Sequence, residues 1–254
     1  MTISELVGLH TASIGAPDVI AKTSSKVLMG TSMVTSKGQG AIKLTGPVQL
    51  ASAGDKLLIA MVFDVANYPY EKVAFDGSDI SVSRHSGPES PLSFFIRANK
   101  TVVKRGIFGG VYNGSWPLLG ADKDEDLDYS GTTKIGETVL HKVKYTAPNL
   151  GNLTVTLYFE DKTFRHVMTE HKFTASGLMS YSPSGLSSGS SDSPDYYTLI
   201  ESFGNFAKAG ELILPLTYSI EFSSKSASSS RKWTMNFNEA YFNETLEPSV
   251  FKVS

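Results

Sequence analysis

Apolar and polar residues alternate along most of this chain, and a period of two is typical of β-strands. From about Ser25, Leu28 and Val34 fall on one side of the alternating segment, while Val27 and Met33 fall on the other. The alternation therefore predicts a protein built mainly from strands. Further strands are predicted over the ranges Leu57–Val65, Tyr70–Phe75, Asp79–Ser83, Leu127–Thr132, Glu137–Thr146, Leu153–Phe159, Arg165–Phe173, Leu212–Phe222, Lys232–Phe242 and Ser249–Val253.

Two segments break the alternation and have the sequence signals of helices. Thr2 and Glu5 have the spacing of a capping box at the start of the chain, and Gly15 ends that segment. A serine followed by a proline at Ser90–Pro91 predicts the start of a second helix. Glycines and a proline then keep Gly106–Leu119 irregular or in short helical turns.

The connections between neighbouring strands, such as the turn at Asp76–Gly77, favour antiparallel pairing over βαβ units. About ten strands are predicted, and Asp195–Lys208 fits either a strand or a short helix. The fold class is therefore mainly β with a few helices (α+β), a curved antiparallel half-barrel sheet covered by helices. We expect a single domain over 1–254, with a helical or irregular lid insert at 90–119 and a flexible Ser/Gly-rich loop at 176–194.

Composition narrows the function classes. With 254 residues, 41% of them apolar, the chain is long enough to bury a large core. Its 23 basic and 25 acidic side chains give a net charge of −2, so we expect no nucleic-acid partner. The chain has no cysteine, which excludes disulfides and thiolate chemistry. No run of about 18 apolar residues predicts a membrane span, and MTISELVGLH does not have the pattern of a signal peptide.

Two histidines and a glutamate lie close together in one predicted strand and suggest a metal site. Strict alternation places His166 and Glu170 on one face of that strand and His171 on the other, so the three cannot bind one ion. The spacing also differs from the helical H-x-x-E-H motif of zinc proteases. We therefore interpret them as surface residues and expect no metal site; a two-ligand site formed by His166 and Glu170 is the remaining alternative.

Other candidates for catalysis are equally weak. Gly185–Gly189 matches the nucleophile-elbow pattern G-x-S-x-G, but it lies in a serine–glycine tract where such matches arise by chance. The acidic run Asp122–Asp128 lacks the glycine and glutamate of a calcium loop, so a solvated turn is the better interpretation. We therefore expect no catalytic residue, no cofactor and no enzymatic activity. A hydrolase with an unrecognised site is a third, weaker hypothesis.

The remaining candidate chemistry is apolar. Phe94, Phe95, Ile96, Phe108 and Trp116 crowd into the segment 90–119. These side chains either plug the sheet as ordinary core or form a movable lid over a hydrophobic cavity. Glycines in the segment favour the lid. The residues predicted to line the cavity from the sheet are Leu58, Ala60, Val62, Leu157 and Phe159, although Leu57–Phe63 is apolar on both sides.

Several longer stretches resemble a known family of bacterial envelope proteins. They are YEKVAFDGSDISV (70–82), SPLSFFIR (90–97), RGIFGGVYNGSWPLL (105–119), the segment 134–173 and ESFGNFAKAGELILPLTY (201–218). Together they are similar to the outer-membrane lipoprotein-sorting carriers, the LolA/LolB-like group. The resemblance implies a half-barrel with a hydrophobic cavity, which agrees with the fold expected from the alternation.

The resemblance also implies a function. It points to a non-enzymatic periplasmic carrier or receptor for a lipid or for lipoprotein acyl chains, with a leader peptide removed and an envelope protein as a further partner. The alternative is an envelope scaffold or protein-interaction module with a solid core and no ligand. Fold-level similarity by itself does not decide between them.

Overall fold

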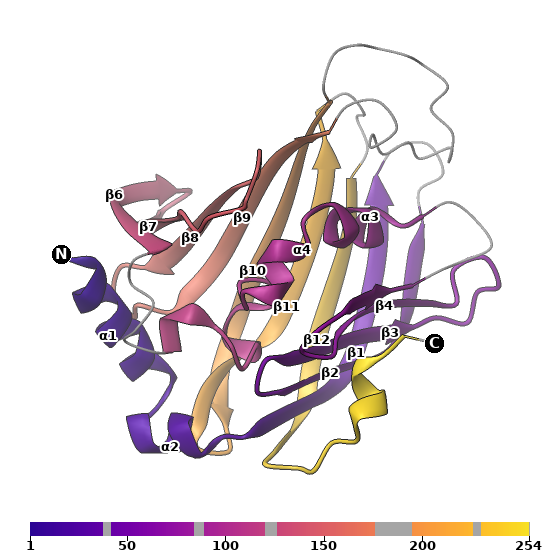
Figure 1. The fold of residues 1–254 in the computed structure, drawn as a ribbon, viewed down its shortest axis with the longest axis horizontal. Coiled ribbons are helices and arrows are strands. Elements are labelled where there is room, and N and C mark those ends of the chain that lie inside the picture. Colours follow the sequence, from indigo (N-terminus) through magenta and orange to yellow (C-terminus); the bar gives the residue numbers. More distant parts are fainter. Residues whose placement is uncertain (38–41, 84–88, 120–125, 176–194, 226–229, 254) are drawn as a thin grey trace.

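The protein is described from a computed structural model that covers residues 1–37, 42–83, 89–119, 126–175, 195–225 and 230–253. Its strands form one curved antiparallel sheet of twelve strands (Figure 1), in the order β5-β4-β3-β2-β1-β12-β11-β10-β9-β8-β7-β6. The strands are β1 (Ser25–Lys37), β2 (Lys43–Ala53), β3 (Lys56–Val62), β4 (Tyr70–Phe75), β5 (Ile80–Val82), β6 (Leu127–Ile135), β7 (Thr138–Tyr145), β8 (Thr154–Glu160), β9 (His166–Ala175), β10 (Asp195–Ala209), β11 (Leu212–Ser224) and β12 (Ser230–Phe242).

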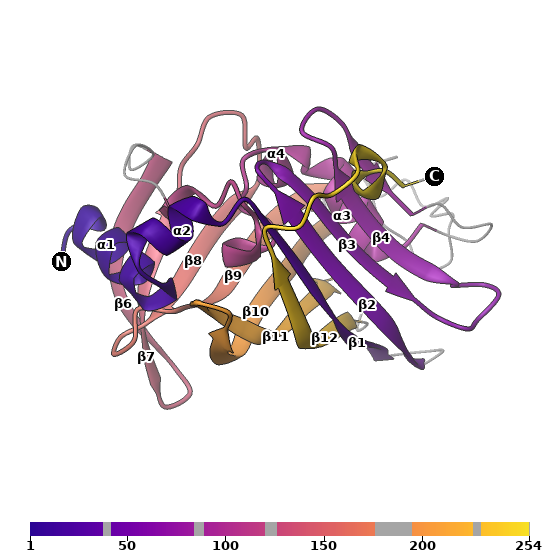
Figure 2. The same ribbon diagram turned by 90° about the horizontal axis from the view of Figure 1, so that it is seen from below.

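Short helices cover one side of the sheet, which we call the inner face. The sheet curves around this side, so the helices lie within the arc (Figure 2). They are α1 (Ile3–Ile14), α2 (Pro17–Lys22), α3 (Pro91–Ala98), α4 (Lys100–Lys104) and the 3-10 helices η1 (Gly110–Tyr112) and η2 (Pro117–Leu119). No helix in the described ranges is long and apolar enough to cross a membrane.

Both predicted helix starts are confirmed. The Thr2 hydroxyl accepts a hydrogen bond from the Glu5 backbone amide, and the Glu5 carboxylate accepts one from the Thr2 amide, which completes a capping box. At α3, Ser90 is the N-cap, its hydroxyl accepts from the Ser93 amide, and Pro91 follows in the first turn. These caps fix where the two covering segments begin.

Of the two alternatives for Asp195–Lys208, the strand is confirmed, as part of the long strand β10. Two other details differ from the prediction. The described sheet has twelve strands rather than about ten. The end of the chain was predicted as a strand over Ser249–Val253, but it forms the 3-10 helix η5 (Pro248–Phe251). The short helix α4 lies within the segment 90–119, which was expected to be helical or irregular. The expected flexible loop at 176–194 lies outside the described residues.

The side of the sheet that η5 covers is the outer face. Phe251 of η5 is 1% exposed and packs against Val27, Ala51 and Leu58, which form a small apolar cluster separate from the main core. Proline at position 248 opens a helical turn, so the last apolar residues of the chain form a cap on the sheet rather than a thirteenth strand. The two faces therefore differ greatly in size, and almost all of the core lies on the inner one.

The prediction that His166 and His171 lie on opposite faces is wrong. The pairing of β8 with β9 contains a β-bulge. Tyr158 pairs with Met168 and the next residue, Phe159, pairs with His166, so β9 has one extra residue at this point. The bulge changes the parity of β9, so both histidines face inward, 2% and 0% exposed. They are core residues and not surface residues.

Candidate functional site

The segment 90–119, which we call the insert, covers the centre of the inner face. Five of its apolar side chains were predicted to form a lid or a plug, and all are at most 2% exposed: Phe94, Phe95, Ile96, Phe108 and Trp116. Leu157 and Phe159, predicted on the sheet side, are also fully buried in this main core. The structure therefore brings seven of the ten predicted residues together, and in this conformation the insert fills the centre of the curved sheet.

Aromatic rings make the contact between the insert and the sheet. The Phe95 ring lies 5.2 Å from His171 and 5.5 Å from Phe173 on β9, measured between centroids. Phe94 lies 5.5 Å from Tyr197 on β10, with the rings at 62°. Edge-to-face and tilted contacts of this kind stabilise by about 0.5–1.5 kcal/mol beyond the burial of apolar area.

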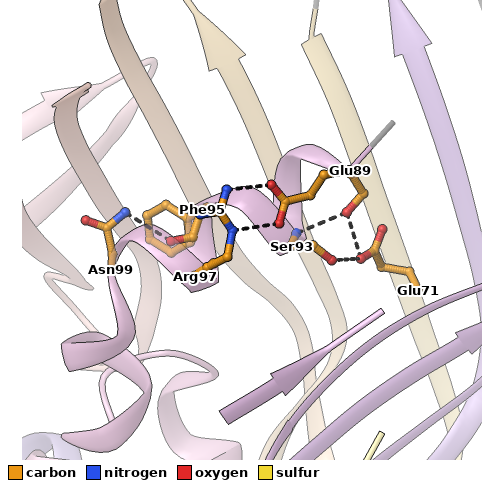
Figure 3. A network of polar contacts seen from close by, with 7 residues as sticks. Glu71, Glu89, Ser93, Phe95, Arg97 and Asn99 are labelled. Carbon is orange, nitrogen blue, oxygen red and sulfur yellow. Dashed lines mark hydrogen bonds and ion pairs between the residues drawn. The ribbon is translucent and has the colours of Figure 1, made fainter. Parts of the chain in front are cut away.

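A buried carboxylate on β4 holds the start of the insert (Figure 3). Glu71 is 0% exposed, and its Oε1 accepts hydrogen bonds from the hydroxyls of Ser90 (2.8 Å) and Ser93 (3.1 Å). The Tyr68 hydroxyl donates to the other oxygen. Burial raises the pKa of Glu71, and the three hydroxyl donors oppose that rise. The group thus links α3 directly to the sheet.

A second buried carboxylate, on β10, holds the middle of the insert. Glu201 is 0% exposed, and its Oε1 accepts from the Gly109 backbone amide at 2.8 Å. The Tyr218 hydroxyl donates to the same oxygen, and His171 Nε2 lies 2.8 Å from Oε2. Gly109 has a φ of 88°, a left-handed conformation that suits glycine and turns its amide toward the sheet.

A histidine on α1 holds the far end of the insert. The Trp116 indole N–H donates to His10 Nε2 at 3.1 Å, and His10 Nδ1 lies 3.0 Å from the Phe164 carbonyl oxygen. Nδ1 therefore carries the proton, and the imidazole is neutral when both bonds form. Burial lowers the pKa of His10 to about 4 and lowers the pKa of the neighbouring His166 well below its ordinary value.

Three of the predicted lining residues lie elsewhere. Leu58 belongs to the outer-face cluster, Ala60 packs at its edge, and Val62 is 46% exposed. The side chains that point to the other side of β3 face the main core and are fully buried. They are Leu57, Ile59 and Met61. Since this strand is apolar on both sides, its alternation could not identify the inner side, and the η5 segment that covers the outer side is distant in sequence.

A pocket of about 270 Å³, lined mostly by aliphatic residues and partly open to solvent, remains where α1 and α2 meet the insert and the sheet. Its walls come from α1 and α2, from the insert and from β11. The one charged side chain among the lining residues is Lys26 of β1, which is 6% exposed. The lining residues are Ile14, Ile20, Ala21, Thr23, Lys26, Val111, Gly114, Leu119, Leu212 and Leu214.

A larger hollow of about 460 Å³ lies at the ends of β8 to β11. Hydroxyl groups line much of it, and two lysines, Lys172 and Lys225, reach it. The Lys225 ammonium lies 5.4 Å from the centre of the Tyr196 ring, and Lys172 pairs with Glu170. Phe173 and the rings of Tyr196 and Tyr197 also line it, so this hollow combines apolar and polar surface.

The chemistry of the site is that of apolar burial with a few buried polar anchors. Within the described ranges, no group of three or more histidine, aspartate or glutamate side chains could hold a metal ion. The His171–Glu201–Tyr218 cluster is fully buried and holds the insert through Gly109. The Gly185–Gly189 match lies outside the described residues, as do residues 122–125 of the acidic run.

The buried charged residues Glu71, Glu201 and Lys26 were not predicted from the sequence. Glu201 has the same strand parity as the apolar residues Leu199 and Phe203, and Lys26 has the same parity as Leu28. A charged residue that alternates in step with apolar residues of its strand lies on their face of the sheet, and this pattern can indicate a buried charge. It was lost for Glu201 because that segment also fitted a helix.

No protein-family model and no curated protein matches the sequence, whereas solved structures match the fold. A LolA superfamily protein from Nitrosomonas europaea superposes with a TM-score of 0.51 at 13% identity, over 100% of this chain and 98% of that one. A DUF1329 family protein from Desulfovibrio piger gives a TM-score of 0.50 at 10% identity, over 99% and 97%. The protein therefore has a LolA-like fold, as the sequence resemblance implied.

Proposed function

We propose that this protein is a non-enzymatic carrier or receptor for a hydrophobic ligand, either a lipid or the acyl chains of a lipoprotein, and that it acts in the periplasm. The LolA-like fold and the sequence resemblance to lipoprotein-sorting carriers support the proposal. The observation that carries it is the pocket of about 270 Å³ that has the insert as one wall. A cavity with a displaceable wall can grow to fit a longer guest.

The driving force for binding is the removal of acyl chains from water. Each CH₂ group contributes roughly 0.8 kcal/mol when it is fully buried. In this proposal the insert is a lid within a single domain, and its aromatic side chains occupy the ligand's place when no ligand is bound. A bound chain would contact the lid residues Phe94, Phe95, Ile96, Phe108 and Trp116 and the sheet residues Leu157 and Phe159.

The alternative function is an envelope scaffold whose solid core binds no ligand. One observation favours it: the five aromatic and aliphatic lid residues are packed as tightly as any core, with at most 2% exposure. The two functions differ in whether the insert ever leaves the sheet, so they can be separated by watching the insert while a ligand is added.

Trp116 allows that observation. The chain has two tryptophans, so the Trp233→Phe variant leaves Trp116 as the only one. Delipidated protein is titrated with a fluorescent long-chain fatty acid, and quenching of Trp116 by acrylamide is followed in parallel with an unlabelled fatty acid. A carrier binds about one probe per chain, and Trp116 becomes accessible as ligand is added. A scaffold binds no probe, and Trp116 stays shielded at every concentration.

A further inference from the structure

Lys26 is an unusual residue in the pocket between α1, α2 and the insert. Its side chain points to the inner face of β1, as that of Leu28 does, and only 6% of the residue is exposed. Most of the other lining residues are aliphatic, and none of the described ones is a carboxylate. Lys22, four positions earlier on α2, provides a contrast, because its side chain is 78% exposed and pairs with Asp18 at 3.3 Å.

The Lys26 ammonium has no hydrogen-bond or ion-pair partner among the residues that the structure describes. Burial alone lowers the pKa of Lys26 to about 8, so the side chain is still mostly protonated at neutral pH. A buried charge without a partner destabilises a fold, and proteins seldom keep one unless it binds something. The pocket beside it is the place where a partner can enter.

We propose that this pocket binds an amphiphile with a small anionic oxygen headgroup, which pairs with the Lys26 ammonium while the apolar body fills the pocket. This inference deepens the proposed function and rests on it, because it assigns a headgroup and a position to the hydrophobic ligand. The site has the usual composition of a ligand pocket, namely mostly aliphatic side chains with a few polar ones, here Thr23 and Lys26, that can fix the orientation.

Size and charge both fit such a ligand. An apolar cavity of about 150 Å³ is enough to bind benzene, so about 270 Å³ has room for a short alkyl chain. Ile20 of α2 and Leu212 and Leu214 of β11 would contact that chain. A longer chain would continue past Val111 of η1 under the rest of the insert. Pairing with an anion would also give Lys26 the partner that the described part of the fold does not supply.

The test compares three probes that share one chain, namely octanoate, octyl phosphate and octanol, by isothermal titration calorimetry at pH 7. Lys26→Met keeps the length of the side chain and removes its charge. It should weaken binding of the tighter anionic probe at least about 10-fold, because hydrogen bonds to charged groups contribute that much, and leave octanol binding within about 2-fold. The matched control, Lys22→Met, removes one positive charge from the same end of the molecule and should leave all three affinities unchanged.

A second readout follows the amine itself. In protein with ¹³C-labelled lysine, the Lys26 Cε signal is identified by its loss in Lys26→Met, and its titration is recorded with and without the tighter anionic probe. Bound anion should raise the apparent pKa of Lys26 from about 8 toward the ordinary lysine value. A pKa that stays unchanged in the presence of saturating probe would contradict the pairing.

The outcomes separate the two proposals. If the anionic probes bind equally well to the original protein and to Lys26→Met, the headgroup site is wrong while the hydrophobic-ligand function stands. If no short probe binds but the long-chain fatty acid does, the pocket is again wrong and the ligand lies under the insert alone. If neither the short nor the long probes bind, both proposals fall. A tighter fit of octanoate or of octyl phosphate identifies the headgroup as carboxylate or phosphate.

Discussion

Two regions of the inner face of this sheet are covered in different ways, one by tightly packed side chains and one by helices that leave a pocket. In the centre, the insert fills the curve with aromatic rings, and the buried carboxylates Glu71 and Glu201 each accept hydrogen bonds from it. At the end covered by α1 and α2, a pocket of about 270 Å³ with mostly aliphatic walls stays empty of side chains, and Lys26 in its wall has no partner among the described residues. The two buried carboxylates of the filled region therefore have partners within the chain, whereas the lysine of the hollow region has none among the described residues.

This difference separates a structural role from a binding role. Buried polar groups in folded proteins almost always have partners, and the carboxylates of the centre follow that rule. They are explained by stability, because they attach a covering segment made of very short helices to the sheet. Lys26 has no such explanation within the described part of the fold. We therefore compare variants in the filled centre with variants at the pocket, and expect their free energies of unfolding to change by different amounts or in opposite directions.

The largest contrast should come from truncating one side chain in each region. Phe95→Ala removes a fully buried ring from the filled centre and should lower the free energy of unfolding by about 3–5 kcal/mol. Leu119→Ala acts at the wall of the existing pocket on a half-buried side chain and should cost only about 1 kcal/mol. Urea denaturation measures both. Equal losses would mean that the pocket is packed as tightly as the centre.

The next prediction concerns the loss of stability in acid that His10, which binds Trp116 at the far end of the insert, should cause. The pKa of His10 is about 4 in the folded protein, below the ordinary value of 6.5, so the unfolded chain takes up a proton first as the pH falls. Stability is therefore complete above pH 6.5 and is lost progressively toward pH 4, by roughly 3 kcal/mol from this group. The neighbouring His166 acts in the same direction.

The variant His10→Gln serves as the control for this acid response. It cannot become charged, so its unfolding free energy should change by roughly 3 kcal/mol less than that of the original protein between pH 6.5 and pH 4. Denaturation curves at several pH values provide the comparison. Parallel pH profiles of the two proteins would show that protonation of His10 is not what weakens the attachment of Trp116.

In the hollow region the sign should reverse, so that a substitution stabilises. Lys26→Met removes a buried charge whose pKa is lowered to about 8, and it should raise the free energy of unfolding at pH 7 by roughly 2–3 kcal/mol. The gain should shrink as the pH rises from 8 to about 10.5, where the original lysine is increasingly neutral. Lys22→Met, at an exposed position, should change stability by less than about 0.5 kcal/mol. A loss of stability in Lys26→Met would show that the lysine already has a partner.

The smallest effect concerns the start of the insert. Ser90→Ala removes both the N-cap of α3 and one donor to Glu71, and should cost about 1–2 kcal/mol. Ser93→Ala removes a donor to the same carboxylate oxygen but keeps the cap, so it should cost less. If the two variants were equally unstable, the capping bond would contribute nothing measurable.

The sequence predicted most of the architecture, and its failures have identifiable physical causes. Alternation and turn signals placed nearly every strand, and the two caps at Thr2 and Ser90 are where they were predicted. The face of His171 was wrong because a single bulged residue changes the parity of everything after it, and short-range patterns do not reveal bulges. The inner side of β3 could not be chosen because its cover on the outer side, η5, comes from the other end of the chain.

The candidate site was predictable only in part. The insert could be recognised by its many aromatic residues. Whether these side chains fill the curve of the sheet or cover a cavity depends on tertiary packing, which the sequence pattern does not show. Glu201 was not singled out because its segment also fitted a helix. Glu71 was not singled out because an acidic residue in a strand is usually exposed. Lys26 was missed for the same reason, and the pocket beside it is formed by α2, η1 and β11, which are far apart in sequence.

The most direct test of the proposed function is native mass spectrometry of the protein purified from cells without detergent. The account predicts a discrete added mass, corresponding to one lipid or fatty acid per chain, that organic extraction removes and incubation with fatty acid restores. Observation of the bare polypeptide mass alone, both as purified and after incubation with an excess of fatty acid, would contradict it and leave the scaffold function.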